Sequence, residues 1–329
     1  MRTAASIPPT SMTALGGPAP NRVVRSERTS KPNSVSDTSS NKPGERTHSE
    51  KPCRHWQGFS FAPCRLQPQL VQMALRLELD HCGNTWSACG SPTDLSIPVN
   101  PVSGMPRAWY RGPALATPVR SDGWTGSVAE GGSVNFRDIT FNPHAHGTHT
   151  ETREHIHDAF QPIDALARAQ GIPFIQPAYL FNALPDSIHD DWVVSKPSNL
   201  DQVLDKWKPS AVILRCTKGD VMRDWSDSNP PYLESGLAEA LAKSEVRHLL
   251  IDLPSVDREV DGGVLRAHHA FFGSDIAPRV GCTISELLCI PESLESGPGL
   301  LAMQVSPFIN DAAPSRPLWF PAEITATTS

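Results

Sequence analysis

Alternating strands and helices predict an α/β domain that follows a disordered N-terminal tail. Two short, continuous apolar runs, residues 211–216 and 248–254, have the length of strands buried on both faces. Between them, residues 231–243 have the apolar periodicity of an amphipathic helix. Its apolar face carries Leu233, Leu237, Ala240 and Leu241. Strand, helix and strand in this order favour an α/β architecture.

The remaining predicted elements are shorter. Helices are expected at residues 163–171, which end at a glycine, and at residues 199–207. Alternation of Val134, Phe136 and Ile139 predicts a strand over 131–141 that runs into a histidine-rich segment. Further strands are expected at residues 94–98, 283–290 and 300–305.

Residues 1–72 differ in composition from the rest of the 329-residue chain. They contain 10 Lys and Arg against 4 Asp and Glu, whereas residues 73–329 contain 19 against 31. A basic stretch rich in Ser, Thr and Pro and without apolar periodicity predicts disorder. Three interpretations remain open: an extension without function, an organelle-targeting peptide, or sequence upstream of a true start at Met73. The prolines at positions 8, 9, 18 and 20 disfavour the helix that a targeting peptide needs.

Charge and cysteine usage exclude several classes of protein. A net charge of −6 gives no reason to expect nucleic-acid binding, and no apolar run is long enough to cross a membrane. Seven cysteines, an odd number without a CxxC pair, argue against a disulfide framework and favour a reducing compartment. Because no hydrophobic signal core follows Met1, we expect a cytoplasmic protein.

Metal-ligand residues gather in a fourteen-residue stretch. It contains His144, His146, His149, Glu151, Glu154, His155 and His157. Imidazoles with a carboxylate are a normal ligand set for zinc or manganese. His149 and Glu151 are two residues apart, so on a strand both project from one face. Surface histidines on a loop are the alternative interpretation.

Other histidines of the stretch can reach His149 and Glu151 if the backbone changes direction. Gly147 permits a bulge that could turn His144 or His146 toward the pair. His155, four residues beyond Glu151, would reach it if the chain becomes helical there.

This segment resembles the signature of the cyclase family, which includes kynurenine formamidases and isatin hydrolases. The signature reads His-x-Gly-Thr-His-x-Asp, followed by another His, and residues 147, 148, 149, 151 and 155 match it in register. Weaker family-like stretches follow in order, so the resemblance covers about residues 90–321. They are residues 94–98, 252–257, 267–272, 284–288 and 313–317.

The resemblance implies a metal site and a fold. It implies that His149 and Glu151 bind metal, with His144 as the first ligand and His146 as the alternative. His268 and Glu286 match later positions that complete the site in formamidases, where two metals can be bound. His155 corresponds to the catalytic histidine. The implied fold is a single swivelling β/β/α domain over residues 73–329, usually dimeric.

The sequence departs from the family pattern at four points. Glu151 replaces the usual Asp, the Pro expected shortly after it is absent, and the first His is displaced by one position. The gap from His268 to Glu286 is also long. These changes leave the substrate and a second metal open.

Three functions are therefore considered. The first is a metal-dependent hydrolase that cleaves the amide bond of a small aryl substrate, with N-formylkynurenine as leading candidate in tryptophan catabolism. The second is hydrolysis of a cyclic amide or lactone, or a polyketide-type cyclisation, at the same metal. The third is a non-catalytic metal-binding protein, against which the presence of His155 argues. Trp109, Tyr110 and Trp124 are candidates to stack on an aryl ring, although core packing explains them equally well.

Overall fold

The computed structural model describes residues 75–158, 161–169 and 175–326. The predicted tail and its boundary at residue 73 lie outside these ranges. Within them, no helix is both long and apolar enough to span a membrane.

Seven strands form a closed, barrel-like sheet. Around the ring the order is β17-β16-β9-β12-β14-β15-β8, and β8 pairs back onto β17. The strands are β8 (His149–Thr152), β9 (Ile175–Asn182), β12 (Ala211–Arg215), β14 (His248–Ile251), β15 (Thr283–Glu286), β16 (Gly297–Val305) and β17 (Ala312–Ala326). Strands β9, β12, β14 and β15 run parallel, and the other neighbours are antiparallel. The fifteen residues of β17 let it pair with β8 at one end and β16 further along, which closes the ring.

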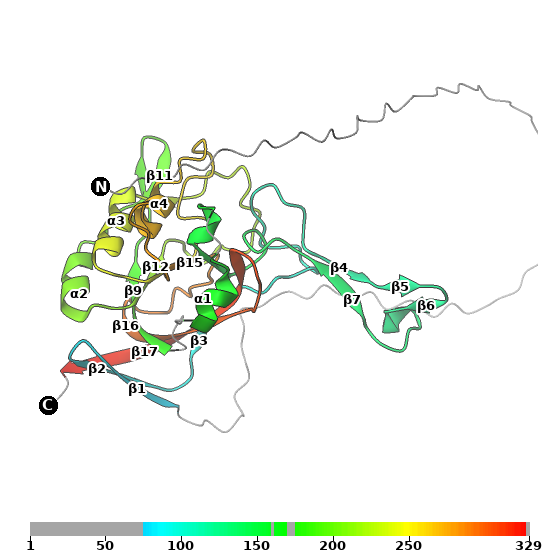
Figure 1. The fold of residues 1–329 in the computed structure, drawn as a ribbon, viewed down its shortest axis with the longest axis horizontal. Coiled ribbons are helices and arrows are strands. Elements are labelled where there is room, and N and C mark those ends of the chain that lie inside the picture. Colours follow the sequence, from blue (N-terminus) through cyan, green and yellow to red (C-terminus); the bar gives the residue numbers. More distant parts are fainter. Residues whose placement is uncertain (1–74, 159–160, 170–174, 327–329) are drawn as a thin grey trace, which may run out of the picture. The chain divides into compact units, whose positions relative to one another are not determined.

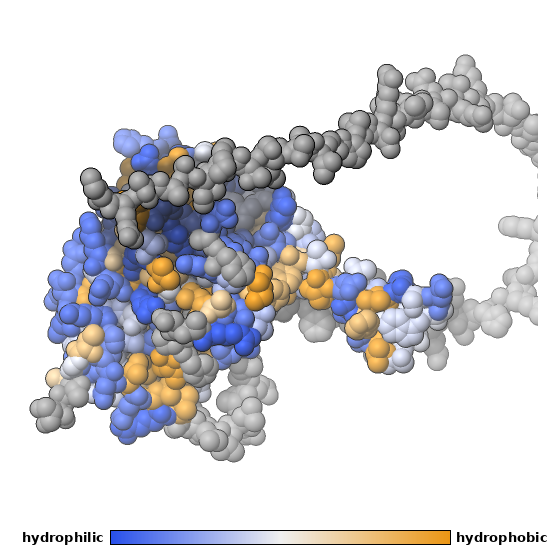
Figure 2. All heavy atoms as spheres, in the orientation of Figure 1, coloured by the Kyte–Doolittle hydropathy of each residue, from blue (hydrophilic) through white to orange (hydrophobic). Residues whose placement is uncertain are grey.

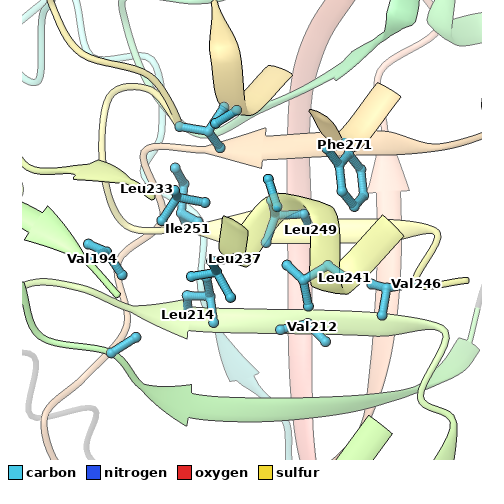
Figure 3. Close-up of a cluster of buried hydrophobic side chains, with 14 of the residues drawn as sticks. Val194, Val212, Leu214, Leu233, Leu237, Leu241, Val246, Leu249, Ile251 and Phe271 are labelled. Carbon is cyan, nitrogen blue, oxygen red and sulfur yellow. The ribbon is translucent and has the colours of Figure 1, made fainter. Parts of the chain in front are cut away.

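Three helices lie in the connections between the parallel strands. They are α2 (Leu200–Trp207), α3 (Ser235–Lys243) and α4 (Arg266–Phe272), and they gather on one side of the sheet in Figure 1. Figure 3 shows Leu237 and Leu241 of α3 above Val212 and Leu214 of β12, and Leu249 of β14 belongs to the same cluster. This contact buries the helical face that the sequence predicts.

The opposite face of the same strands fills the barrel. Ala211 and Ile213 of β12 pack there with Leu250, Leu301 and Trp319. Successive residues of β12 therefore enter different cores, which explains its continuous apolar sequence. The predicted strands buried on both faces, and the α/β fold class, are confirmed.

Smaller elements surround the barrel. A hairpin of β1 (Arg76–His81) and β2 (Asn84–Cys89) extends the sheet beyond β17, and β3 (Thr93–Asp94) pairs with β17. The helix α1 (Ile163–Ala169) contacts β8 and β16. A second sheet contains β10 (Asp186–Ile188), β11 (Asp191–Val194) and β13 (Tyr232–Leu233).

Residues 115–140 form an extended arm, which runs out to the right in Figure 1. It is built from β4 (Leu115–Pro118) paired with β7 (Arg137–Thr140), and from β5 (Arg120–Ser121) paired with β6 (Trp124–Thr125), with a 3-10 turn η1 (Val128–Glu130). The predicted strand over 131–141 is wrong in extent, because only β7 is extended and paired. Its alternating apolar residues are not buried: Phe136 is 59% exposed and Ile139 53%.

Other differences from the predicted elements are local. Only Asp94 of the expected strand 94–98 lies in a strand. Leu95 bonds to Pro317 of β17 and to Cys289, whereas Ile97 bonds to Thr148 just before β8, so these residues form no continuous ladder. The helix α4 and the strands β1, β2 and β17 were not predicted.

Candidate metal centre

The start of β8 is fixed by the Gly147-Thr148 pair of the sequence motif. Gly147 has a φ of 148°, and a Cβ there would lie 2.8 Å from the carbonyl oxygen of Ile97, so no side chain fits. Thr148 accepts a hydrogen bond from the amide of Ile97 (2.7 Å) and donates one to the carbonyl of Leu287 (2.5 Å). These bonds hold β8 between two other segments and set the direction of the ligand-type residues that follow.

Glu151 lies at the centre of the cluster and is fully buried. Its Oε2 lies 3.2 Å from Nδ1 of His144 and 3.8 Å from Nε2 of His155, and its Oε1 lies 3.0 Å from Nε2 of His268. A buried carboxylate in contact with three imidazoles is the core of a metal-ligand arrangement.

His149 and Glu286 form the other side of the same cluster. The antiparallel register of β8 and β15 places these two residues opposite each other, and Nε2 of His149 lies 3.4 Å from Oε2 of Glu286. In the part of the chain that the structure describes, no arginine pairs with Glu286, and its Oε1 accepts a hydrogen bond from the amide of Val256. The spacing argument therefore holds: His149 and Glu151, two residues apart on β8, both face the cluster.

His155 reaches the cluster through a 3-10 turn, η2 (Arg153–His155), that directly follows β8. The side chain of Thr152 accepts a hydrogen bond from the amide of Glu154 and so caps this turn. This is the helical change of direction that the sequence required. The ring of His155 lies 4.3 Å from that of His144, centroid to centroid.

The outer nitrogen of each site imidazole has a fixed acceptor. Asp311 Oδ2 lies 2.9 Å from Nε2 of His144 and 3.0 Å from Nδ1 of His155. Asp257 Oδ2 lies 2.7 Å from Nδ1 of His268, and the carbonyl of Gly147 lies 3.1 Å from Nδ1 of His149. When each outer N–H donates to these acceptors, the inner nitrogen of the neutral ring carries a lone pair that faces the cluster.

The carboxylates of the cluster strongly favour positive charge on their neighbours. Burial alone would lower the pKa of His144, but the neighbouring carboxylates of Asp311 and Glu151 raise it to about 10. Burial also opposes protonation of His268, yet the charge of Glu151 and the hydrogen bond to Asp257 raise its pKa to about 10. Glu151 itself has a pKa well below its usual range, because the neighbouring imidazoles outweigh the cost of burial.

These residues fit a divalent metal. Two groups, His144–Glu151–His155 and His149–Glu151–Glu286, each bring their ligand atoms within 4.8 Å of one another, and they share Glu151. Nε2 of His149 and Oε2 of Glu151 are buried without a hydrogen-bond partner. Such buried atoms are costly unless something satisfies them, and a cation would do so. The cluster could therefore hold a metal.

His146, the alternative first ligand, does not join the cluster. Its Nδ1 accepts a hydrogen bond from the amide of Asn142 (2.8 Å), so its Nε2–H donates to the carbonyl of Gly112 (2.8 Å). Both ring nitrogens are therefore used by the backbone. The structure places His144 in the cluster together with the five other predicted residues, namely His149, Glu151, His155, His268 and Glu286.

Asp311 is the residue of this site that the sequence did not reveal. It lies 156 residues after His155, in no recognisable motif, and only its position just before the family-like stretch at 313–317 was a signal. Asp257, in the family-like stretch 252–257, both caps backbone amides and holds a site histidine. Besides His268 Nδ1, it accepts the amides of Ala267 and His268 at the start of α4. Asp252 only caps, since it bonds to Cys216 and Thr217.

The cluster opens into a cavity of about 360 Å³. His144, His155, His268 and Glu286 line one part of it. Trp109, Arg111 and Arg258 are among the residues that line the rest. Of the three aromatic residues that the sequence suggested, only Trp109 lines the cavity; Tyr110 is 63% exposed and Trp124 lies in the arm.

Comparison with known proteins matches this geometry. Residues 93–258, half of the chain, match the family model described as putative cyclase. The chain belongs to the cyclase family. The matched range includes the motif at 147–155 but not His268, Glu286 or Asp311, which the fold alone brings to it.

Several solved structures are similar to this chain. An isatin hydrolase bound to the product analogue thioisatinate is 13% identical, with a TM-score of 0.50 over 70% of this chain and 92% of that one. Isatin hydrolase A from Labrenzia aggregata is 13% identical, with a TM-score of 0.50 over 70% of this chain and 94% of that one. A predicted metal-dependent hydrolase from Bacillus stearothermophilus is 18% identical, with a TM-score of 0.46 over 70% of this chain and 97% of that one. A comparison with curated proteins gave no match.

Proposed function

We propose that this protein is a metal-dependent hydrolase that cleaves the amide bond of a small aryl substrate, with N-formylkynurenine as the leading candidate. The observation that carries the proposal is the environment of Glu151: a fully buried carboxylate, one oxygen of which has no hydrogen-bond partner, among imidazoles whose inner nitrogens face it. Zinc or manganese suits this mixture of nitrogen and oxygen ligands. The reaction would be an arylformamidase step in tryptophan breakdown.

The residues of this chain have separate tasks in such a reaction. His144, His149, Glu151 and Glu286, which belong to the two candidate ligand groups, would hold the metal. His268, which contacts Glu151, would complete the set. A divalent metal held by these residues would lower the pKa of water to roughly 7 and would polarise a substrate carbonyl. Water adds to the formyl carbon, the C–N bond breaks, and formate and the free aryl amine leave.

We assign the transfer of the proton to His155. Its Nδ1 is held by Asp311, so its Nε2 is directed to the cluster and the cavity. This nitrogen takes a proton from the attacking water and gives it to the departing amine nitrogen, a role that suits an imidazole. Cys216 is no alternative nucleophile, because burial and the nearby Asp252 raise the pKa of its thiol well above the usual value.

Hydrolysis of a cyclic amide is the second candidate. The fold shared with isatin hydrolases supports it, since isatin is a cyclic aryl amide. The same metal and the same proton carrier would serve, because only the connection between the amine and the acyl group differs. Lactone hydrolysis and polyketide-type cyclisation have no separate structural support.

Formate release from N-formylkynurenine is the decisive measurement. Purified protein is treated with a chelator, reloaded with zinc or manganese, and assayed together with His149→Ala. We expect metal-dependent turnover that this substitution removes, because the loss of a ligand exceeds the roughly 10- to 100-fold effect of losing an outer partner.

Stoichiometric metal binding without formate release would contradict the formamidase assignment. In that case isatin opening, followed by absorbance, decides for or against the cyclic-amide reaction. A protein that binds metal through His149 yet hydrolyses neither substrate would favour the non-catalytic alternative. Asp275→Asn is a suitable control, since this exposed carboxylate pairs with Arg153 and His157 but with no residue of the cluster.

We also propose that the protein is a homodimer, as the family resemblance implies, with the arm in the interface. The arm exposes Leu115, Trp124, Val128, Val134, Phe136 and Ile139, and Figure 2 shows hydrophobic side chains along it. Exposed apolar area of this kind marks an interaction surface. Sedimentation velocity should give twice the 35.7 kDa chain mass for the wild type and a single chain for Phe136→Ser with Ile139→Ser. Val102→Ser, an exposed position outside the arm, should leave the mass unchanged.

A further inference from the structure

Two arginines line the cavity beside the metal cluster, and they differ in their pairing. Arg258 donates to Asp191 at 2.8 Å, so its charge is already compensated. Arg111 has no carboxylate partner in the described part of the chain; its only side-chain bond is from Nε to the carbonyl of Trp109 at 3.3 Å. Arg111 therefore offers an unpaired guanidinium at the same cavity as His155.

The loop that carries Arg111 is fixed on both sides. Arg107 is ion-paired with Asp224 at 2.7 Å, and the amide of Tyr110 donates to Ser226 Oγ at 2.9 Å. The carbonyl of Gly112 accepts the Nε2–H of His146, a histidine of the motif that does not join the cluster. His146 thus has a task of its own, which is to hold this loop next to the cluster.

Two acidic residues of the same cavity, Asp261 and Glu259, are bonded to backbone amides and not to Arg111. Asp261 accepts the amides of Gly263, Val264 and Leu265. Glu259 accepts the amides of Asp227 and Asn229. Both carboxylates are thus engaged by backbone N–H groups, which stabilise their charge, and neither is bonded to Arg111.

We infer that Arg111 binds a carboxylate on the part of the substrate remote from the scissile bond, so that the preferred substrates are aryl amides that carry a carboxylate. This inference rests on the proposed function, and it deepens it. A guanidinium binds a carboxylate through two parallel hydrogen bonds and so orients as well as attracts it. The cavity of about 360 Å³ has the size of small-molecule sites.

The test compares one substrate with its uncharged analogue. N-formylkynurenine and its carboxamide differ only in the carboxylate. We expect Arg111→Gln to raise KM for the acid about 10- to 100-fold, the usual worth of a hydrogen bond to a charged group, and to leave kcat/KM for the carboxamide within about twofold. Arg111→Lys should recover part of the loss. Arg168→Gln, which changes an exposed arginine on α1 that does not line the cavity, should alter neither substrate.

Calorimetric binding separates this inference from the proposed function. The metal-loaded protein is titrated with L-kynurenine and with its carboxamide, so that no turnover is needed. Weaker binding of kynurenine alone in Arg111→Gln supports the inference even if no formate is released by the wild type. Equal losses for acid and carboxamide, no loss for either, or no binding of kynurenine to the wild type would each overturn it.

Discussion

Buried histidines at two ends of β15 behave in opposite ways. At one end, next to Glu286, His268 is surrounded by Glu151, Asp257 and Glu286, and its pKa is raised to about 10. At the other end, next to Thr283, His248 is equally buried, and its pKa is lowered to about 3 by burial and by the charges of Arg247 and Arg279. The side chain is the same in both cases, and only the surrounding charges differ.

The charges around a buried histidine distinguish a candidate metal site from a purely structural position. Both regions contain a buried imidazole nitrogen without a hydrogen-bond partner, Nε2 of His149 in one and Nε2 of His248 in the other. Around His149 the neighbours are carboxylates, which favour a cation. Around His248 the charged neighbours are guanidinium groups, which exclude one. A lone buried nitrogen therefore indicates a metal only where negative charge converges on it.

The larger effect on function is expected from Asp311→Asn, which removes a negative charge from the carboxylate-rich cluster around His149. Asp311 accepts bonds from both His144 and His155, so the substitution disturbs a metal ligand and the proton carrier together. We expect a loss of about 10- to 100-fold in metal affinity or in turnover, as for other outer partners of metal-binding histidines. Competition with a chelating dye measures the metal affinity, and formate release measures turnover.

A matched substitution tests whether the loss of any carboxylate next to a histidine would have the same effect. Asp275→Asn also removes a carboxylate that contacts a histidine, His157, and should leave both measurements within about twofold because His157 is not in the cluster. Equal effects of the two substitutions would contradict the orienting role of Asp311.

The sequence predicts one half of this site well and the other half poorly. Strand periodicity predicts that His149 and Glu151 share one face, and a helical turn after the strand brings His155 to them. Both predictions succeed because they depend only on residues close together in the sequence. His268 and Glu286 were available only through the family resemblance, since β15 and α4 meet β8 by long-range pairing. Asp311 lies on the chain just before β17 and could not be found, because the closure of the barrel brings it to the cluster.

The choice between His144 and His146 illustrates the same limit. Gly147 was correctly seen as the place where the strand pattern could change, but its backbone conformation depends on contact with Ile97. The alternation of Val134, Phe136 and Ile139 predicted a strand with a buried face, yet the arm leaves that face exposed. Periodicity gives the face that is apolar, and it does not say whether this chain covers it.

The smaller effect is expected from His248→Gln, which tests whether the arginines near His248 keep its imidazole neutral. The pKa of His248 is lowered in the folded state, so the unfolded chain binds a proton there below about pH 6.5 while the folded chain does not. This histidine therefore costs no stability at pH 7, and it destabilises the fold progressively as the pH falls from about 6.5 toward 3. At pH 5 the cost is about 2 kcal/mol, the difference of roughly 1.5 pH units from the unfolded pKa.

The measurement is the change in unfolding free energy between pH 7 and pH 5, from urea titrations of the wild type and the variant. Gln cannot titrate, and its amide can still bond to Thr283 Oγ1, so the change should be smaller in His248→Gln by about 2 kcal/mol, whatever its stability at pH 7. His189→Asn is the control, because His189 is exposed and its positive φ suits Asn, and it should retain the wild-type difference. If His248→Gln keeps the full loss between pH 7 and pH 5, His248 is protonated in the fold despite its arginine neighbours. The distinction between the two ends of β15 would then be wrong.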